Sequence, residues 1–169
     1  AKYAGKVQSI CEEVERELPK LAEPHYRLGR MLRAQMLDDE ALAEQDKAVA
    51  KEPAYAPARY ERVVLLSRLH RRRIRDLLGQ AWRDEGARLA AEGGRVRAAQ
   101  AVRPPDMKAI EARDATAKEL LKRIQADLGG LKEGLSAAER LCAAGTGAWV
   151  SGDSARAASQ FEAAISKEP

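Results

Sequence analysis

Apolar residues recur every three or four positions along most of the chain, which is the spacing of amphipathic helices. The stripe is visible at the very start of the sequence, where its members are Tyr3, Val7, Ile10, Val14 and Leu18. Pro19 follows directly, and a proline does not continue a helix. The pattern therefore predicts an entry helix within residues 1–20.

Two later stretches, residues 22–53 and 137–169, each predict a pair of helices. In the first stretch, helices are expected over about residues 22–35 and 39–51, with Asp38 as the N-cap of the second helix and Pro53 as its stop. In the last stretch, Ser136 and Glu139 have the spacing of a capping box, which predicts where its first helix begins.

The same small residues occupy the same places in both stretches. Gly29 lies twelve residues before Ala41, which lies twelve before Pro53, and the second set with this spacing is Gly145, Ala157 and Pro169. Both stretches also close on Lys-Glu-Pro. This regularity predicts one supersecondary unit used at least twice, with two helices that cross closely at the glycine and the alanine.

The spacing resembles the tetratricopeptide repeat (TPR) family, whose signature is W-x2-L-G-x2-Y, then A-x3-F, then P. The first stretch reads His25-x2-Leu28-Gly29-x2-Leu32, Ala41-x3-Gln45 and Pro53, and the last reads Leu141-x2-Ala144-Gly145-x2-Ala148, Ala157-x3-Phe161 and Pro169. Phe161 apart, the family's large aromatic positions hold other residues. The resemblance implies an all-α fold, a right-handed α-solenoid of antiparallel helix pairs.

The middle of the chain is expected to be irregular. The two Lys-Glu-Pro marks are 116 residues apart, which exceeds three periods of 34 residues by about 14. Residues 56–92 are predicted to form a degenerate TPR-like unit, with one helix from Ala56 and a second from about Arg72. Residues 93–135 are predicted to form a helical insert, with one helix that Asp106 caps and that the Gly129–Gly130 pair ends. The expectation is a longer helical hairpin in place of a regular repeat.

Composition agrees with a single helical domain over residues 1–169. Apolar residues make up 45% of the chain, aromatics only 4% and charged residues 33%, with a net charge of +4. No apolar run reaches the ~20 residues that span a bilayer, and no signal peptide is evident. A cytoplasmic protein is therefore expected. Since the sequence begins without Met and stops at the end of a repeat, we also expect it to be a piece of a larger protein.

Candidate chemistry is sparse. No phosphate-binding loop, dinucleotide fingerprint or H-E-x-x-H motif occurs. His25 and His70 are predicted on different helices, and Cys11 and Cys142 lack metal-ligand spacing, so they are expected to be small buried hydrophobes. Asp38 and Asp39 are explained by the start of a helix. The sequence therefore predicts no catalytic residue, no metal, no cofactor and no enzymatic activity.

The TPR resemblance implies protein–protein recognition in a concave groove lined by the first helix of each pair. The residues expected there are Tyr26, Arg27, Arg30, Arg33, Tyr60, Val64, Arg68, Thr146 and Trp149. This basic and aromatic surface favours an acidic or extended peptide segment. The carboxylate clamp of some TPR proteins is absent, because its positions hold Tyr26 and Arg30.

Other functions remain open at this level. The stretch from Arg59 to Arg75 includes the basic patch Arg71, Arg72, Arg73 and Arg75. This stretch is either a solvated helix face or a docking site for nucleic acid or an acidic peptide. The chain is also compatible with a regulatory or substrate-recruiting segment of a larger signalling enzyme, such as a bacterial serine/threonine kinase. Self-association through uncapped repeat ends is a further expectation.

Overall fold

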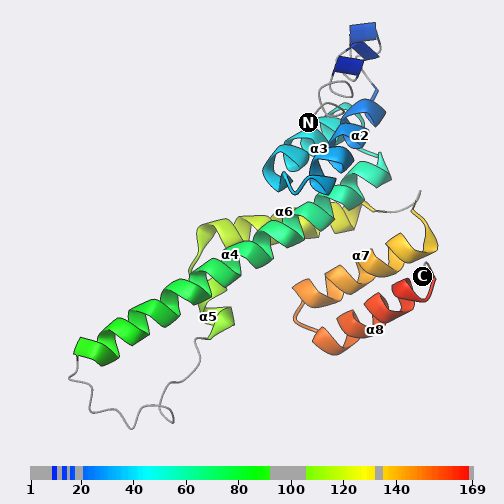
Figure 1. The fold of residues 1–169 in the computed structure, drawn as a ribbon. Coiled ribbons are helices and arrows are strands. Elements are labelled where there is room, and N and C mark those ends of the chain that lie inside the picture. The colour runs from blue at the N-terminus through cyan, green and yellow to red at the C-terminus, as the bar shows by residue number, and fades with distance from the viewer. Residues whose placement is uncertain are drawn as a thin grey trace.

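The structure is a computed structural model that describes residues 9–10, 13–14, 16–17, 21–91, 106–131 and 135–167. Within these residues every regular element is a helix, which confirms the all-α class (Figure 1). The predicted entry helix falls largely outside them, although its described positions are helical.

The first helix pair consists of α2 (Glu23–Ala34) and α3 (Asp38–Lys51). A Cβ atom on Gly29 would lie 3.0 Å from Cδ of Gln45 and 3.1 Å from the carbonyl oxygen of Ala41. Gln45 also donates a hydrogen bond of 3.0 Å from Nε2 to the carbonyl oxygen of Tyr26. The predicted crossing at Gly29 and Ala41 is therefore confirmed.

The last pair, α7 (Ala137–Val150) and α8 (Ser154–Ile165), is built in the same way. A Cβ atom on Gly145 would lie 2.7 Å from Cε1 of the Phe161 ring, and Ala157 is buried. The predicted capping box is present, because Ser136 and Glu139 each accept a backbone hydrogen bond from the other. Glycine is needed once in the connecting turn, where Gly152 has a φ of +85°.

The predicted pair of helices over residues 56–92 is wrong, because α4 (Ala56–Ala91) is one continuous helix of 36 residues. The expected break lay between Leu69 and Arg72, where the sequence is His-Arg. Neither residue is a glycine or proline, and arginine is a good helix former. With no breaker, the helix continues.

The single helix predicted after Asp106 is also wrong. Asp106 caps only the short helix α5 (Met107–Glu111), with hydrogen bonds from the backbone N–H groups of Lys108 and Ala109. Asp114 then caps a separate helix, α6 (Ala115–Gly130), by accepting a 2.7 Å bond from the N–H of Ala117. An aspartate side chain can accept hydrogen bonds from the free backbone N–H groups at the start of a helix, so it favours the N-cap position over the helix interior. The prediction of one continuous helix overlooked this preference at Asp114.

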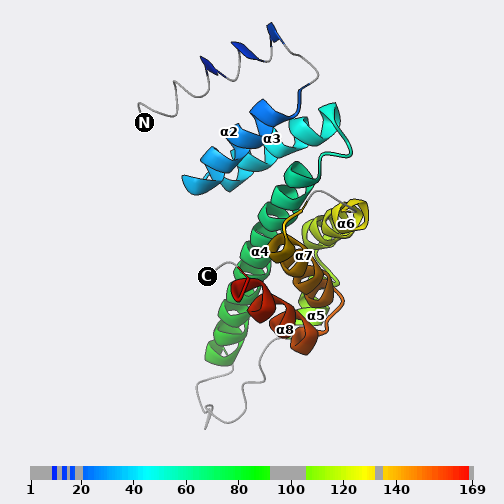
Figure 2. The same ribbon diagram turned by 90° about the vertical axis from the view of Figure 1, so that its right-hand side faces the viewer.

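Helix α6 runs antiparallel to α4, because Arg62 contacts Asp127 while Arg73 contacts Asp114. Their shared core includes the larger side chains Val63, Leu66 and Ile124. The two outer helix pairs instead have a glycine at the point where their helices cross. The α2/α3 pair lies against the first part of α4, and α7/α8 packs on the α4/α6 pair (Figures 1 and 2). The second half of α4 extends away from this body (Figure 1).

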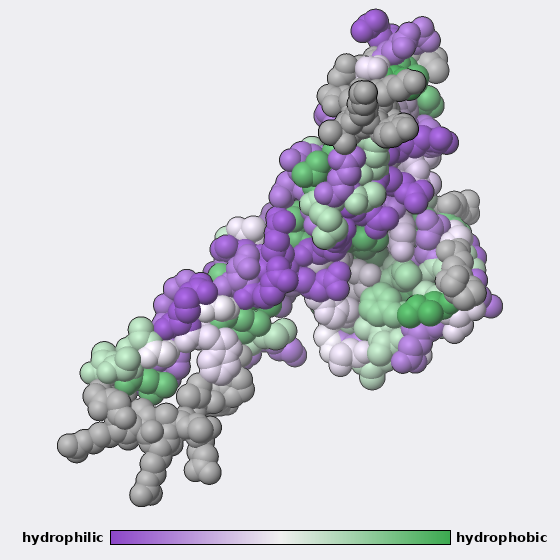
Figure 3. Space-filling view, viewed as in Figure 1, coloured by the Kyte–Doolittle hydropathy of each residue, from purple (hydrophilic) through white to green (hydrophobic). Residues whose placement is uncertain are grey.

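Polarity is distributed unevenly over the face seen in Figure 3. Hydrophilic residues follow the middle of α4, whereas hydrophobic residues gather over α7 and α8. Phe161 and Ile165 of α8 are among the exposed large hydrophobic side chains, and Ile165 is 69% exposed. The α7/α8 pair therefore presents apolar surface that its own partner helices do not cover.

Two glycine substitutions in α7 should have opposite effects on stability. Gly147→Ala should raise the free energy of unfolding by about 0.5–1 kcal/mol, since alanine suits a helix better and the new methyl meets only Leu128 at 3.8 Å. Gly145→Ala should lower it by about 1–3 kcal/mol, because the methyl collides with the Phe161 ring. Urea denaturation measures both changes, and stabilisation by both variants would contradict the close crossing.

Candidate functional site: the arginine stretch and the clefts beside helix α4

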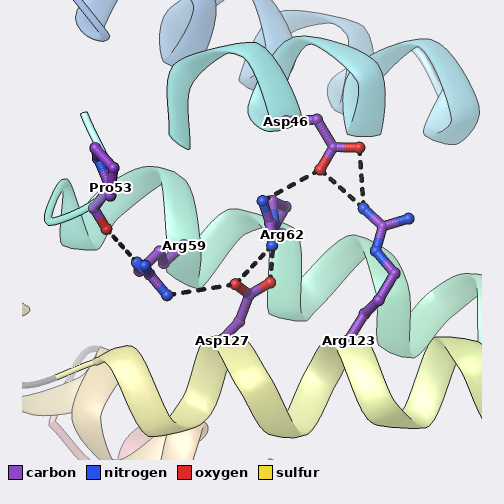
Figure 4. A network of polar contacts seen from close by, with 6 residues as sticks. All are labelled: Asp46, Pro53, Arg59, Arg62, Arg123 and Asp127. Carbon is purple, nitrogen blue, oxygen red and sulfur yellow. Dashed lines mark hydrogen bonds and ion pairs between the residues drawn. The ribbon is translucent and has the colours of Figure 1, made fainter. Parts of the chain in front are cut away.

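Buried carboxylates neutralise the first arginines of the Arg59–Arg75 stretch. Arg62 donates from Nε and Nη2 to the two oxygens of Asp127, each at 2.8 Å, and Asp127 is only 1% exposed (Figure 4). Arg59 approaches the same carboxylate at 3.7 Å. Burial raises the pKa of Asp127, and the neighbouring guanidinium groups oppose that rise.

Asp46 extends this contact to a third helix. It lies on α3, 3.3 Å from Nη1 of Arg62 on α4 and 2.8 Å from Nη2 of Arg123 on α6 (Figure 4). Arg59 also donates to the carbonyl oxygen of Pro53, in the turn before α4. The network therefore joins α3, α4 and α6 through planar, charge-assisted hydrogen bonds.

Three further arginines have carboxylate partners. Arg68 pairs with Asp38 at 3.1 Å, Arg72 with Asp39 at 3.0 Å and Arg73 with Asp114 at 2.6 Å. Asp38 is thus not the predicted N-cap: α3 begins at Asp38 itself and makes no side-chain cap bond. Within the described part of the chain, five of the seven arginines in the stretch pair with a carboxylate, and Arg71 and Arg75 do not.

The site residues predicted on α2 also have internal partners. Arg27 pairs with Glu23 at 2.6 Å, while Arg33 and Arg30 lie 3.1 Å and 3.6 Å from Glu61. Burial is the larger influence on Glu61 and raises the pKa of its carboxyl, whereas the two arginines lower it. Tyr26 packs edge-on against Tyr55, with ring centroids 5.6 Å apart. None of the four predicted residues, Tyr26, Arg27, Arg30 and Arg33, lines either cleft described below.

A cleft of about 370 Å³ between α4 and α7, the α4–α7 cleft, brings other predicted residues together. Those residues are Tyr60, Val64, Thr146 and Trp149, and Arg71 joins them from the predicted basic patch. Sequence reasoning missed Ser67, Cys142 and Phe161 on its walls. The α4 members lie four, three and four residues apart, so helical periodicity could have found Ser67.

The polar groups of the α4–α7 cleft differ in their partners: Thr146 donates to the carbonyl oxygen of Cys142 at 2.9 Å, whereas Ser67 lacks a partner for its hydroxyl. Ser67 is 8% exposed, and its Oγ has no hydrogen-bond partner. Burial and the neighbouring Cys142 thiol raise the pKa of Tyr60. Cys142 is half-buried rather than fully buried as predicted. None of the described residues that line the cleft is a carboxylate, so Arg71 is the charged group among them that a ligand would meet.

A larger cavity of about 760 Å³, the cationic cavity, lies beside the α4–α7 cleft and shares Arg71 and Trp149 with it. Its charged lining residues are Arg71, Arg75, Lys108, Lys118 and Glu111. Its apolar walls come from α4, α5, α6 and α7. No local pattern in the sequence indicates Lys108 and Lys118, because their place depends on how α5 and α6 fold back along α4.

His70 forms part of the wall of the cationic cavity and is 3% exposed. Its ring lies edge-on to Trp149, with centroids 5.5 Å apart, and its Nε2 is 3.4 Å from Oε1 of Glu111. Neither ring nitrogen makes a hydrogen bond. Burial lowers the pKa of His70 more than Glu111 raises it. The ring is therefore neutral at pH 7 and has unused hydrogen-bonding capacity.

The described residues contain no group of three or more His, Cys, Asp or Glu side chains that could hold a metal ion. Nor does any described helix combine the length and the apolar character needed to cross a membrane. Comparison of the chain with known proteins finds no matching family model, no matching curated protein and no matching solved structure.

The buried and exposed ion pairs of the arginine stretch should differ in their effect on stability. Asp127→Ala should lower the free energy of unfolding by about 3 kcal/mol, because Arg62 would lose the carboxylate that accepts two of its hydrogen bonds and would keep only Asp46. Asp39→Ala should change it by less than about 1 kcal/mol, because Asp39 is 71% exposed. Chemical denaturation compares the two, with Asp127→Asn as a milder variant, and equal losses would contradict the network.

The pair between Arg73 and Asp114 should make stability depend on pH. The Arg73 guanidinium and backbone N–H groups lower the pKa of Asp114, so the contribution is complete above the ordinary aspartate pKa of about 4. It is lost as the pH falls through the lowered pKa. Asp114→Asn keeps a good N-cap but removes the charge. Wild type should therefore be more stable at pH 7, and its advantage should vanish near pH 2. A difference that is constant with pH, measured by urea denaturation, would refute this.

Proposed function

We propose that this chain is a TPR-like interaction module without catalytic activity, which binds an acidic, extended peptide segment of a partner protein. The binding site in this proposal is the α4–α7 cleft rather than the α2 surface. The observation that carries it is a cleft with aromatic walls and one unpaired arginine, without a carboxylate.

The two outer helix pairs support the repeat class. In both, a glycine of the first helix lies against the side chain four residues after the buried alanine of the second: Gln45 in one and Phe161 in the other. These residues stand at the G, A and F positions of the TPR signature, although the F position of the first pair holds Gln45. The α4/α6 pair between them serves as the longer hairpin of the proposed array, with Val63 and Ile124 in its core.

Complementarity supports the ligand class. Tyr60, Trp149 and Phe161 supply amphipathic and aromatic contact area of the kind that dominates peptide recognition. Arg71 can hold a carboxylate with two parallel hydrogen bonds, and its Nε donates to the backbone oxygen of Ser67 at 3.3 Å. A segment with an apolar anchor next to an Asp or Glu fits both features.

The other hypotheses have less support. Nucleic-acid binding through the Arg59–Arg75 stretch would need arginines available for phosphate, yet most of them contact Asp38, Asp39, Asp114 and Asp127. Service as a regulatory segment of a larger enzyme is compatible with peptide binding. Self-association stays a prediction, for which the exposed Ile165 is the relevant surface.

Selection from a display library of random dodecapeptides tests the proposal without a known partner. Wild type should enrich peptides in which Asp or Glu adjoins an aromatic or aliphatic residue. Arg71→Gln should weaken binding of the selected peptides about tenfold, since a charge-assisted pair is worth about 1.5 kcal/mol.

Arg156→Gln is the matched control, because Arg156 is exposed, makes no ion pair and lines neither cleft. It should bind the selected peptides as wild type does. Enrichment without acidic residues, or equal losses for both variants, would contradict the assignment of the cleft.

A further inference from the structure

We propose that the cationic cavity is a separate binding site for a small amphiphilic anion, a molecule with an apolar body and one carboxylate. This ligand goes beyond the peptide proposed for the α4–α7 cleft, and its site is argued mainly from other residues, although Arg71 and Trp149 line both. A volume of about 760 Å³ is in the range of small-molecule sites.

The charges of the cationic cavity are unbalanced. Arg71, Arg75, Lys108 and Lys118 line it, and none of them forms an ion pair with a carboxylate of the residues that the structure describes. Glu111 is the one acidic lining residue, and it lies next to His70. In the first half of α4, Arg59, Arg62, Arg68, Arg72 and Arg73 have intramolecular carboxylates. Four cations around one concave surface repel one another, and a bound anion removes that repulsion.

The walls of the cationic cavity are mainly apolar. Ile74 and Leu78 of α4, Met107 of α5 and Leu121 of α6 contribute, together with Val150 at the end of α7. Met107 is 55% exposed, although methionine adapts well to ligands of different shape. Inorganic phosphate would leave these walls exposed to water. A ligand with an apolar body covers them, which favours an acyl or aryl carboxylate over a simple ion.

His70 supplies the third observation. It is 3% exposed, lines the cavity and has two ring nitrogens without hydrogen bonds. A buried polar group without a partner is costly. A neutral imidazole carries one N–H. Both ring nitrogens are buried, and Glu111 lies 3.4 Å from Nε2, so the N–H can donate to a ligand carboxylate once the Glu111 side chain moves aside. The edge-on contact with Trp149 holds the ring in place.

Decanoate is a suitable probe because it combines one carboxylate with an apolar chain. In a Trp82→Phe background, Trp149 is the one remaining tryptophan and reports on the cavity wall. Titration below the critical micelle concentration should change Trp149 fluorescence and give saturable heat in calorimetry. Decanol, which lacks the charge, and acetate, which lacks the chain, should each bind at least tenfold more weakly.

The variant Lys108→Gln/Lys118→Gln should weaken decanoate binding about tenfold, since each lysine contributes a partly exposed charge contact. The control, Lys122→Gln/Lys167→Gln, removes two exposed lysines that do not line the cavity and should bind as wild type. Circular dichroism verifies that both variants fold. No saturable binding, equal binding of decanol, or equal affinity of the two double variants would overturn the proposal.

Discussion

The fork between Arg62 and Asp127 is the contact on which the rest of the arrangement depends. It joins residues 65 positions apart in the sequence, and Asp127 is almost completely buried. Removal of either partner would leave a buried charge, so the pair strongly disfavours other registers of α6 on α4. With that register set, Asp114 reaches Arg73 and Glu111 reaches His70. The position of α5, and with it the cationic cavity, follows from this one ion pair and the core beneath it.

The same arrangement explains why only part of a basic helix can bind a ligand. Carboxylates from α3 and α6 neutralise the arginines on two sides of α4, because those helices pack there. The remaining side faces α7 and the turn before α8, which bring no acidic residue to Arg71 and Arg75. Packing therefore divides the arginines into two groups. Those on the covered faces of α4 form intramolecular ion pairs, and those on the uncovered face keep a positive charge that a ligand can reach. A count of basic residues in the sequence cannot make this distinction.

The sequence predicted what local spacing determines. The α2/α3 and α7/α8 pairs follow from Gly29, Ala41, Gly145 and Ala157, since small residues at fixed intervals require close crossings. The capping box at Ser136 is equally local. The continuity of α4 was misjudged because the repeat spacing was given more weight than the absence of a breaker after Leu69. The start of α6 was missed because the apolar spacing continues on both sides of Asp114 and therefore suggested one helix. The partnership of α4 with α6 depends on ion pairs across dozens of residues, which no local pattern reveals.

Prediction of the candidate site succeeded for residues placed by helical periodicity and failed for residues placed by tertiary packing. Tyr60, Val64 and Trp149 were expected on one groove and do share one cleft, because they lie on faces that periodicity identifies. Lys108, Lys118 and Cys142 were missed because their positions depend on tertiary packing.

The two clefts meet at Arg71 and Trp149. Ligands that both bind the Arg71 guanidinium would compete for its charge. Each would then weaken the binding of the other by the same factor, because coupling between binding sites is reciprocal. A small anion in the cationic cavity would thereby regulate peptide binding without any change in the helical frame.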